Sequence, residues 1–100
     1  AETIAASATR LPFVLASYNA GIGHLLDATR LAEKYQNEKY NWEIASHFLL
    51  NKSQRRFYSE NVVKHGYCRG TEPVKYVSEI VNRYEQYKKL IPLALNKQED

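Results

Sequence analysis

The stretch "SYNAGIG" at residues 17–23 carries side chains suited to binding a sugar. Tyr18 offers a flat aromatic face with a polar tip, and the amide of Asn19 can both donate and accept hydrogen bonds. Gly21 interrupts the helical pattern here, because glycine readily adopts the left-handed backbone that ends a helix. The segment therefore predicts either an ordinary corner between two helices or a corner that opens into a cleft, where Tyr18 and Asn19 face a ligand.

Glu72 is a further candidate because it directly precedes Pro73. Proline fits the first turn of a helix and steers the residue before it away from helical dihedral angles. We therefore expect Glu72 at the mouth of the last helix, where a carboxylate either caps free amide groups or faces a cleft.

The histidines and the cysteine form no recognisable reactive or metal-binding pattern. His24, His47 and His65 are 23 and 18 residues apart, which is not the spacing of zinc ligands. Cys68 is the only cysteine, so an internal disulfide is impossible, and a catalytic pair with His65 is not favoured. "GIGH" lacks the third glycine and the preceding strand of a phosphate-binding loop. We expect no metal site and no cofactor.

The composition describes at most one small globular domain of 100 residues. With 44% hydrophobic and 25% charged residues the chain is neither disordered nor of low complexity, and no run of 18 apolar residues predicts a membrane-spanning helix. The opening "AETIAASATR" does not have the pattern of a signal peptide. A net charge of +3 suits an anionic polymer such as a bacterial cell wall, whereas the lack of a basic stripe or an RNA-binding signature disfavours nucleic acid.

Helical periodicity dominates the sequence, and strand signals are nearly absent, so the fold class is all-α. We expect helices over about 10–18, 22–36, 42–51 and 54–60, followed by an irregular stretch at 64–73. A last helix begins near Pro73, and Asn41 is a plausible N-cap for the third one.

The same periodicity predicts which face of a helix is buried. In the helix at 22–36, one face collects Ile22, Leu25, Leu26, Thr29, Ala32 and Tyr35, and the opposite face Asp27, Arg30, Glu33 and Lys34. The apolar stripe of the last helix consists of Val74, Val77, Ile80, Val81, Tyr84, Tyr87 and Ile91.

Two ordered blocks resemble the lytic murein transglycosylases of glycoside hydrolase family 23, including their membrane-bound F type. "FVLASYNAGIGHLLDATRLA" is similar to the family's Ala-Tyr-Asn-x-Gly motif, with the Gly-His and the "xxDARRLA" helix that follow it. "FYSENVVKHGYCRGTEPVKYVSEIVNRYEQY" is similar to the family's terminal stretch, where an Arg-Gly, a Glu and an aromatic-Val pair open the last helix. The resemblance covers roughly residues 11–87.

This resemblance implies the C-terminal portion of a lysozyme-like helical domain. Such enzymes cut the β-1,4 bond between N-acetylmuramic acid and N-acetylglucosamine in peptidoglycan without adding water, and the product is a 1,6-anhydro sugar. One glutamate acts as acid and then as base, and it needs a raised pKa in a partly apolar cleft. The substrate's own 6-hydroxyl is the nucleophile, so a second carboxylate is not required.

Carried over to this chain, the resemblance implies four substrate-binding residues. Tyr18 and Asn19 would line the cleft, Glu72 would contact substrate without being the proton donor, and Tyr76 would turn toward the sugar. The residues alone also allow Glu72 to be a helix cap and Tyr76 to be a core aromatic.

The chain departs from the family where the proton donor is concerned. The Glu-Ser-x-Phe-type motif and the following Gly-Leu-Met-Gln motif do not occur, so no catalytic residue is assigned and the chain alone is expected to be inactive. "AETIAAS" resembles the start of the preceding helix in the family, and residues that usually intervene are expected to be missing near 7–10.

The sequence therefore predicts one partial transglycosylase domain over residues 1–100, with peptidoglycan strands as its partner. The expected location is the cell envelope or periplasm of a Gram-negative bacterium, with outer-membrane association possible only through regions outside the chain. Three alternatives remain: a non-catalytic glycan-binding module, a helical domain that binds a protein through its tyrosines, and a true hydrolase on the same scaffold.

Overall fold

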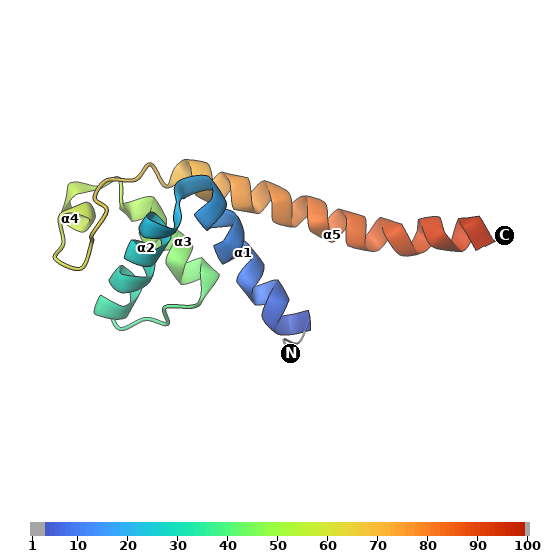
Figure 1. Ribbon diagram of the computed structural model, residues 1–100, viewed down its shortest axis with the longest axis horizontal. Helices are drawn as coiled ribbons and strands as arrows, with labels where there is room; N and C mark the ends of the chain where they lie inside the picture. Colours follow the sequence, from blue (N-terminus) through green and yellow to red (C-terminus); the bar gives the residue numbers. More distant parts are fainter. Residues whose placement is uncertain (1–3, 100) are drawn as a thin grey trace.

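Every regular element in the described part of the chain is a helix. The computed structural model describes residues 4–99, with side chains described for residues 10–96. The helices are α1 (Ile4–Ala20), α2 (Ile22–Lys34), α3 (Trp42–Asn51), α4 (Arg55–Tyr58) and α5 (Thr71–Glu99) (Figure 1). The all-α prediction is confirmed. None of the described helices is long and apolar enough to cross a membrane.

The break in "SYNAGIG" is a tight corner between α1 and α2. The N–H of Gly21 donates to the carbonyl of Ser17 at 2.9 Å, and Gly21 has φ +96°, in the left-handed region that favours glycine. A Cβ at this position would meet no atom within 4 Å, so the backbone conformation alone explains the glycine. The sequence located this corner correctly, and α2 begins at the next residue.

The larger of two hydrophobic clusters lies between α2 and α3. Ala28 and Ala32 are fully buried there, and their small side chains let α2 approach the side chains of Phe48 and Leu49 on α3. Phe57 of α4 and Cys68 of the following loop complete the cluster.

The predicted buried face of α2 is only partly right: Leu25 and Ala32 are buried as expected, but other positions are not. Ile22 is 60% exposed and Leu26 is 41% exposed, whereas Asp27, which was expected on the solvent face, is fully buried. The helix is rotated because its small residues pack on α3 and because Asp27 has hydrogen-bonding partners inside the protein. Ile22, Leu26 and Tyr35 of the predicted apolar stripe therefore remain exposed in this chain.

The second cluster joins α1 to α5. Ala16, Leu25 and Val77 are buried at its centre, and the ring of Phe13 packs edge-on against Trp42 with centroids 5.6 Å apart. α5 therefore packs on α1 through the apolar stripe that the sequence predicted for the first turns of α5. The structure confirms this part of the prediction.

The segments around α3 follow the sequence closely. Asn41 caps α3, because its side chain accepts a hydrogen bond from the N–H of Ile44 at 3.2 Å. α4 is shorter than the predicted 54–60, and the stretch before α5 is irregular as expected. Gly70 lies directly against α3, where a Cβ would overlap the backbone carbonyl of Leu49.

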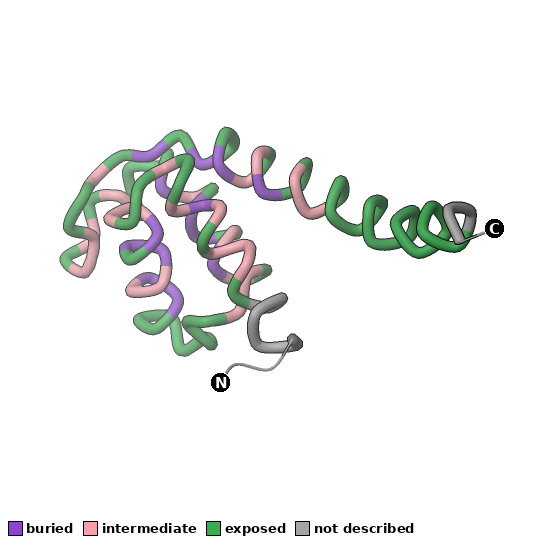
Figure 2. The backbone as a smooth tube through the Cα atoms, turned by 45° about the vertical axis from the view of Figure 1, so that its right-hand side comes forward, coloured by how far each residue is buried: buried purple, intermediate pink, exposed green. Residues whose placement is uncertain are grey.

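α5 extends far beyond the rest of the protein. Its first turns are partly buried, but every described residue from Asn82 to Asn96 is exposed (Figure 2). The molecule consequently measures 61 × 28 × 17 Å. The predicted gap falls near residues 7–10, and no side chain is described before Arg10. The backbone of α1 passes these positions as a helix. That residues of the family are missing there stays a prediction.

Candidate functional site

Tyr18 and Asn19 lie on the last turn of α1, at the corner that leads into α2. The side chain of Tyr18 is 85% exposed, and Asn19 is also exposed. The corner therefore presents the phenol and the amide to solvent and does not use them in its own packing.

Glu72 lies in the first turn of α5 and is exposed. Pro73 follows it inside the same turn, as the sequence predicted, and is buried. Glu72 itself is helical, contrary to the expectation drawn from Pro73, because α5 begins at Thr71. The first turns of α5 pass beside the corner between α1 and α2 in both views of the backbone (Figures 1 and 2). Glu72, Tyr18 and Asn19 consequently belong to neighbouring segments at one end of the α1–α5 contact.

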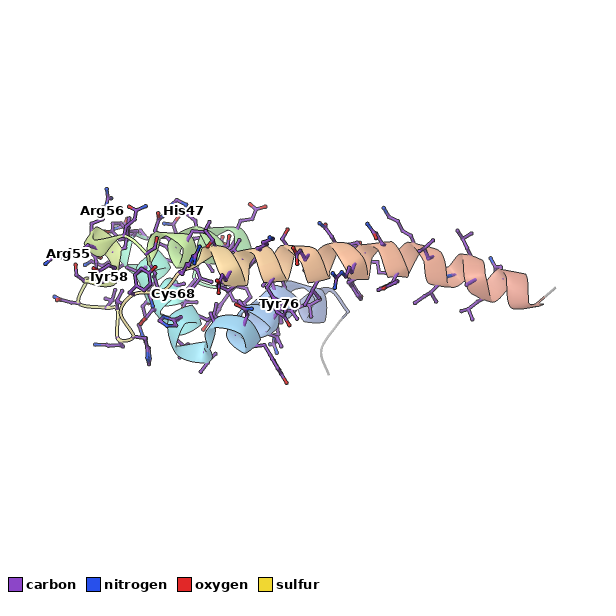
Figure 3. All side chains as sticks on the ribbon, turned by 90° about the horizontal axis from the view of Figure 1, so that it is seen from above. His47, Arg55, Arg56, Tyr58, Cys68 and Tyr76 are labelled. Carbon is purple, nitrogen blue, oxygen red and sulfur yellow. The ribbon has the colours of Figure 1, made fainter. Side chains whose placement is uncertain are left out.

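Tyr76 differs from the other three, because it is half-buried and packs against the cluster of Ala16, Leu25 and Val77. Figure 3 shows it on the part of α5 that passes α1. At least part of its ring belongs to the core, which was the alternative that the residues alone allowed.

An open groove of about 680 Å³ lies between α1, α2 and the loop that follows α2. Apolar side chains of Phe13, Ile22 and Leu26 line it, with Arg30 and Lys39 among its polar residues. None of the four sequence-predicted site residues lines this groove. It instead contains part of the apolar face of α2 that the chain leaves uncovered.

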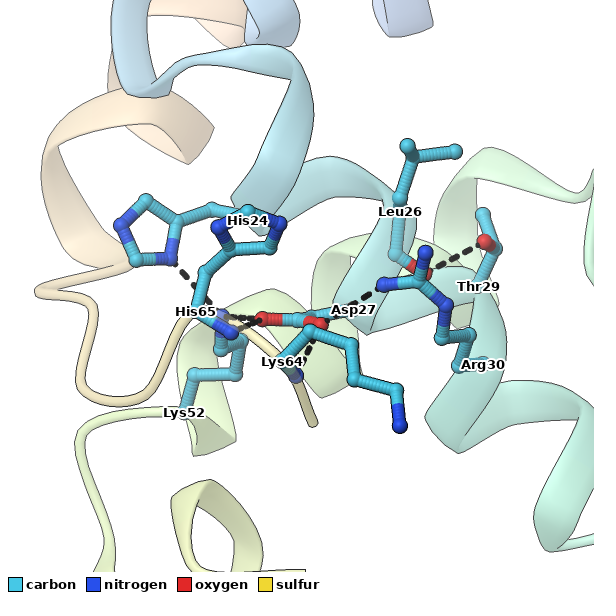
Figure 4. A network of polar contacts seen from close by, with 8 residues as sticks. All are labelled: His24, Leu26, Asp27, Thr29, Arg30, Lys52, Lys64 and His65. Carbon is cyan, nitrogen blue, oxygen red and sulfur yellow. Dashed lines mark hydrogen bonds and ion pairs between the residues drawn. The ribbon is translucent and has the colours of Figure 1, made fainter. Parts of the chain in front are cut away.

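The carboxylate of Asp27 is the centre of a buried polar network, although helical periodicity had placed Asp27 on the solvent face of α2. Lys52 Nζ lies 2.6 Å from Asp27 Oδ2, and both side chains are fully buried (Figure 4). The backbone N–H of Lys64 donates to Oδ1 at 2.7 Å, and that of His65 donates to Oδ2 at 2.8 Å. Arg30 completes the set, with its guanidinium 3.0 Å from Oδ1.

His24 joins this network through Lys52. Lys52 Nζ lies 2.8 Å from His24 Nδ1, and because an ammonium group can only donate, Nδ1 must accept and the ring proton must be on Nε2. The ring of His65 packs near His24, with centroids 6.3 Å apart, and a Cβ at Gly23 would come within 2.8 Å of the His65 ring.

The surroundings of Asp27 and His24 shift the pKa values of both side chains. Burial alone would raise the pKa of the Asp27 carboxyl, but hydrogen bonds from Lys52 and from the N–H groups of Lys64 and His65 outweigh it and hold that pKa below 3.8. Burial, followed by the charge of Lys52, lowers the pKa of His24 below 6.5. Asp27 is therefore a carboxylate and His24 a neutral imidazole at neutral pH.

Asp27 is thus poorly suited to donate a proton. Burial raises the pKa of the Cys68 thiol, which therefore lacks the thiolate character of a nucleophile. Among the described residues, no group of three or more His, Cys, Asp or Glu side chains could hold a metal ion.

Comparison with known proteins identifies the class to which this arrangement belongs. No family model matches the chain. Curated relatives do match over about three quarters of it, and they show that the chain is related to a segment of the lytic murein transglycosylases.

Several curated relatives are named membrane-bound lytic murein transglycosylase F. The protein of that name from Maricaulis maris is 45% identical over 71 residues, which is 71% of this chain and 15% of the relative. That from Marinobacter nauticus is 44% identical over 73 residues, or 73% of this chain and 14% of the relative. That from Desulfosudis oleivorans is 36% identical over 77 residues, or 77% of this chain and 16% of the relative. The chain therefore spans only about a seventh of the length of these relatives.

Proposed function

We propose that this chain is a segment of a peptidoglycan lytic transglycosylase and that it forms one wall of the glycan-binding cleft. The observation that supports this most directly is the exposed pair Tyr18–Asn19, which belongs to the motif that resembles the transglycosylases, in a chain that is up to 45% identical to relatives of that name. Glu72, on the neighbouring first turn of α5, adds an exposed carboxylate to the same wall.

The chemistry of these side chains fits an amino sugar polymer. A phenol can stack on the apolar face of a pyranose ring, and its hydroxyl can bond to a sugar hydroxyl. The amide of Asn19 can pair with an N-acetyl group, because both carry one donor and one acceptor. Glu72 can accept hydrogen bonds from sugar hydroxyls.

The proton-transferring glutamate belongs, in this proposal, to the part of the longer protein that the chain does not include. Asp27 is the fully buried carboxylate among the described residues, and its hydrogen bonds favour the charged form, which is the opposite of what a general acid requires. Glu60 is half-buried and lies 2.9 Å from Lys34, so it too is engaged in an ion pair.

In the complete protein we expect cleavage of the bond between N-acetylmuramic acid and N-acetylglucosamine, with formation of the 1,6-anhydro product. The relatives' names place them at membranes, and we propose the cell envelope as the location of the parent protein. Tyr76 supports the wall from its half-buried position and contributes less direct contact than Tyr18.

Two experiments test the proposal. Titration of this chain with purified muropeptides should shift the amide signals of Tyr18, Asn19 and Glu72 in heteronuclear NMR spectra, whereas the chain alone should release no anhydro sugar. Digestion of peptidoglycan by the parent protein should yield anhydro-muropeptides, as resolved by chromatography and mass spectrometry.

Each result separates this proposal from an alternative. Reducing-end products from the parent would indicate a hydrolase, and binding without any cleavage by the parent would indicate a glycan-binding module. Amide shifts confined to surfaces away from these three residues would contradict the proposed wall.

A further inference from the structure

The buried network around Asp27 connects segments that are far apart in the sequence. Asp27 lies on α2, Lys52 is the C-cap of α3, and residues 64–65 belong to the irregular loop before α5. A buried ion pair contributes little net stability compared with apolar packing, so stability does not account for the burial of Asp27 and Lys52. The effect of this network is instead to fix the position of the loop before α5.

The loop is held at two points directly before Glu72. Its backbone N–H groups at Lys64 and His65 donate to Asp27, and the N–H of Cys68 donates to the carbonyl of Lys52 at 3.3 Å. Gly70 then packs on the backbone of α3, and α5 begins at the next residue. The position of the first turn of α5 is therefore set by contacts that depend on Asp27 and Lys52.

The same contacts reach the corner that carries Tyr18 and Asn19. The His65 ring packs against Gly23, in the first turn of α2, and His24 is the next residue. A loop that moved away from Asp27 would change both the start of α2 and the start of α5.

We propose that Asp27 and Lys52 are positioning residues, which hold residues 64–70 so that the first turn of α5, with Glu72, stays next to the corner that carries Tyr18 and Asn19. We also propose that His24 makes this arrangement sensitive to acid. The inference rests on the proposed function, since it assigns the network to the glycan-binding wall. Asp27 and Lys52 contact no substrate in this scheme and act through the backbone that they fix.

The acid sensitivity follows from the hydrogen-bond directions. His24 Nδ1 accepts from Lys52, so a proton on Nδ1 would place two positive groups 2.8 Å apart. The titratable groups that face His24 are Lys52 from α3, Asp27 from its own helix and His65 from the loop; Asp27 partly offsets the repulsion and the other two do not. Protonation of His24 should therefore displace Lys52 and loosen the loop.

The test uses the ¹⁵N-labelled chain, with exchange of the Lys64 and His65 amide protons and the affinity for a purified disaccharide-tetrapeptide muropeptide as its two measurements. Asp27→Asn keeps the shape and removes the charge. We expect it to speed amide exchange at both positions and to weaken muropeptide binding about tenfold. Glu85→Gln is the matched control, because Glu85 also pairs with a lysine but is exposed, and it should change neither measurement.

His24→Asn tests the acid-sensitive part, because its carboxamide oxygen can replace Nδ1 as an acceptor but cannot be protonated. The wild-type chain should bind muropeptide several-fold more weakly at pH 5.5 than at pH 7.5, and the variant should show a flat pH profile. If Asp27→Asn does not fold, this variant still decides the proposal.

The outcomes are separable from those of the proposed function. If both variants fold and keep the affinity, the amide exchange and the pH profile of the wild-type chain, the positioning role is overturned while glycan binding stays intact. If the wild-type chain binds no muropeptide, the proposed wall fails, and the pH-dependent shifts of the Tyr18 and Glu72 amides then decide the coupling. Shifts that follow His24 titration and vanish in His24→Asn would support the coupling, and their absence would exclude it.

Discussion

At the scale of single residues, Asp27 and Lys52 are the least expected feature of the chain. Helical periodicity placed Asp27 on the solvent face of α2, and nothing in the sequence singled out Lys52, yet both side chains are fully buried. Asp27 and Lys52 are 25 residues apart in the sequence, and no local sequence pattern reveals a contact over that separation. Asp27 shares its predicted face with Arg30, Glu33 and Lys34, so the sequence could not distinguish it from an ordinary surface acid.

Lys52→Ala should be strongly destabilising. It removes the cation and leaves the Asp27 carboxylate buried with only Arg30 and two backbone donors, so we expect a loss of about 3–5 kcal/mol in the free energy of unfolding. Urea unfolding followed by circular dichroism at pH 7 measures this. Lys88→Ala is the control, because Lys88 pairs with Glu85 at the surface and should cost less than about 0.5 kcal/mol. Equal effects of the two changes would contradict the structural description of the pair.

Stability should also depend on pH through His24. Its pKa is lowered in the folded chain, so the unfolded chain binds the proton more tightly, and stability should fall as pH drops below 6.5. Asp27 adds a second loss below pH 3.8, because its lowered pKa makes the unfolded chain the stronger acceptor there too. Urea unfolding at a series of pH values should show both steps in the wild type and only the lower one in His24→Asn. A first step of unchanged size in the variant would assign it to another group.

At the scale of elements, the sequence was most informative where local chemistry decides. The corner at Gly21, the Asn41 cap and the start of α5 within two residues of Pro73 were all predicted, because each depends on the backbone preferences of one or two residues. The buried face of α2 was predicted only in part, for Leu25 and Ala32 but not for Asp27, because it depends on which neighbour the helix packs against. The exposure of Tyr18 likewise depends on tertiary packing, and periodicity could only offer it as one of two possibilities.

Gly66 and Gly70, in the loop before α5, are also explained differently: Gly66 by its backbone conformation and Gly70 by close packing on another helix. Gly66 has φ +67° with open space around its Cα, whereas Gly70 is buried against the carbonyl of Leu49. Gly66→Ala should therefore cost about 1 kcal/mol of backbone strain, and Gly66→Asn less, since Asn tolerates this conformation. Gly70→Ala should cost at least about 2 kcal/mol, because backbone must move to admit a methyl group. Thermal unfolding ranks the three variants, and a Gly70→Ala chain as stable as Gly66→Asn would contradict the close contact.

At the scale of the whole molecule, the chain leaves two apolar surfaces uncovered. One is formed by Ile22 and Leu26 of α2, which line the groove, and the other follows α5 beyond Val81. Single exposed apolar residues are ordinary, but contiguous stripes along a helix are typical of surfaces that pack on something else. This agrees with the proposal that the chain is one part of a larger protein.

Removal of residues 88–100 provides a direct test of how α5 is held. The described residues of that segment are exposed, so they contribute little packing, and the truncated chain should unfold within about 1 kcal/mol of the full chain. Its shape should change far more than its stability. The radius of gyration is 16.6 Å, whereas a compact protein of 100 residues has about 13 Å, and the excess comes from the projecting end of α5.

Small-angle X-ray scattering on both chains measures this difference, and urea unfolding measures the stability. The matched control is a truncation that begins at Tyr76, because it removes Val77 from the buried cluster with Ala16 and Leu25 and should abolish cooperative unfolding. A chain lacking 88–100 that kept the original radius, or lost several kcal/mol, would mean that the outer part of α5 folds back onto the body in solution. The apolar stripe of α5 would then be covered by the chain itself, and would no longer support the proposal of a larger protein.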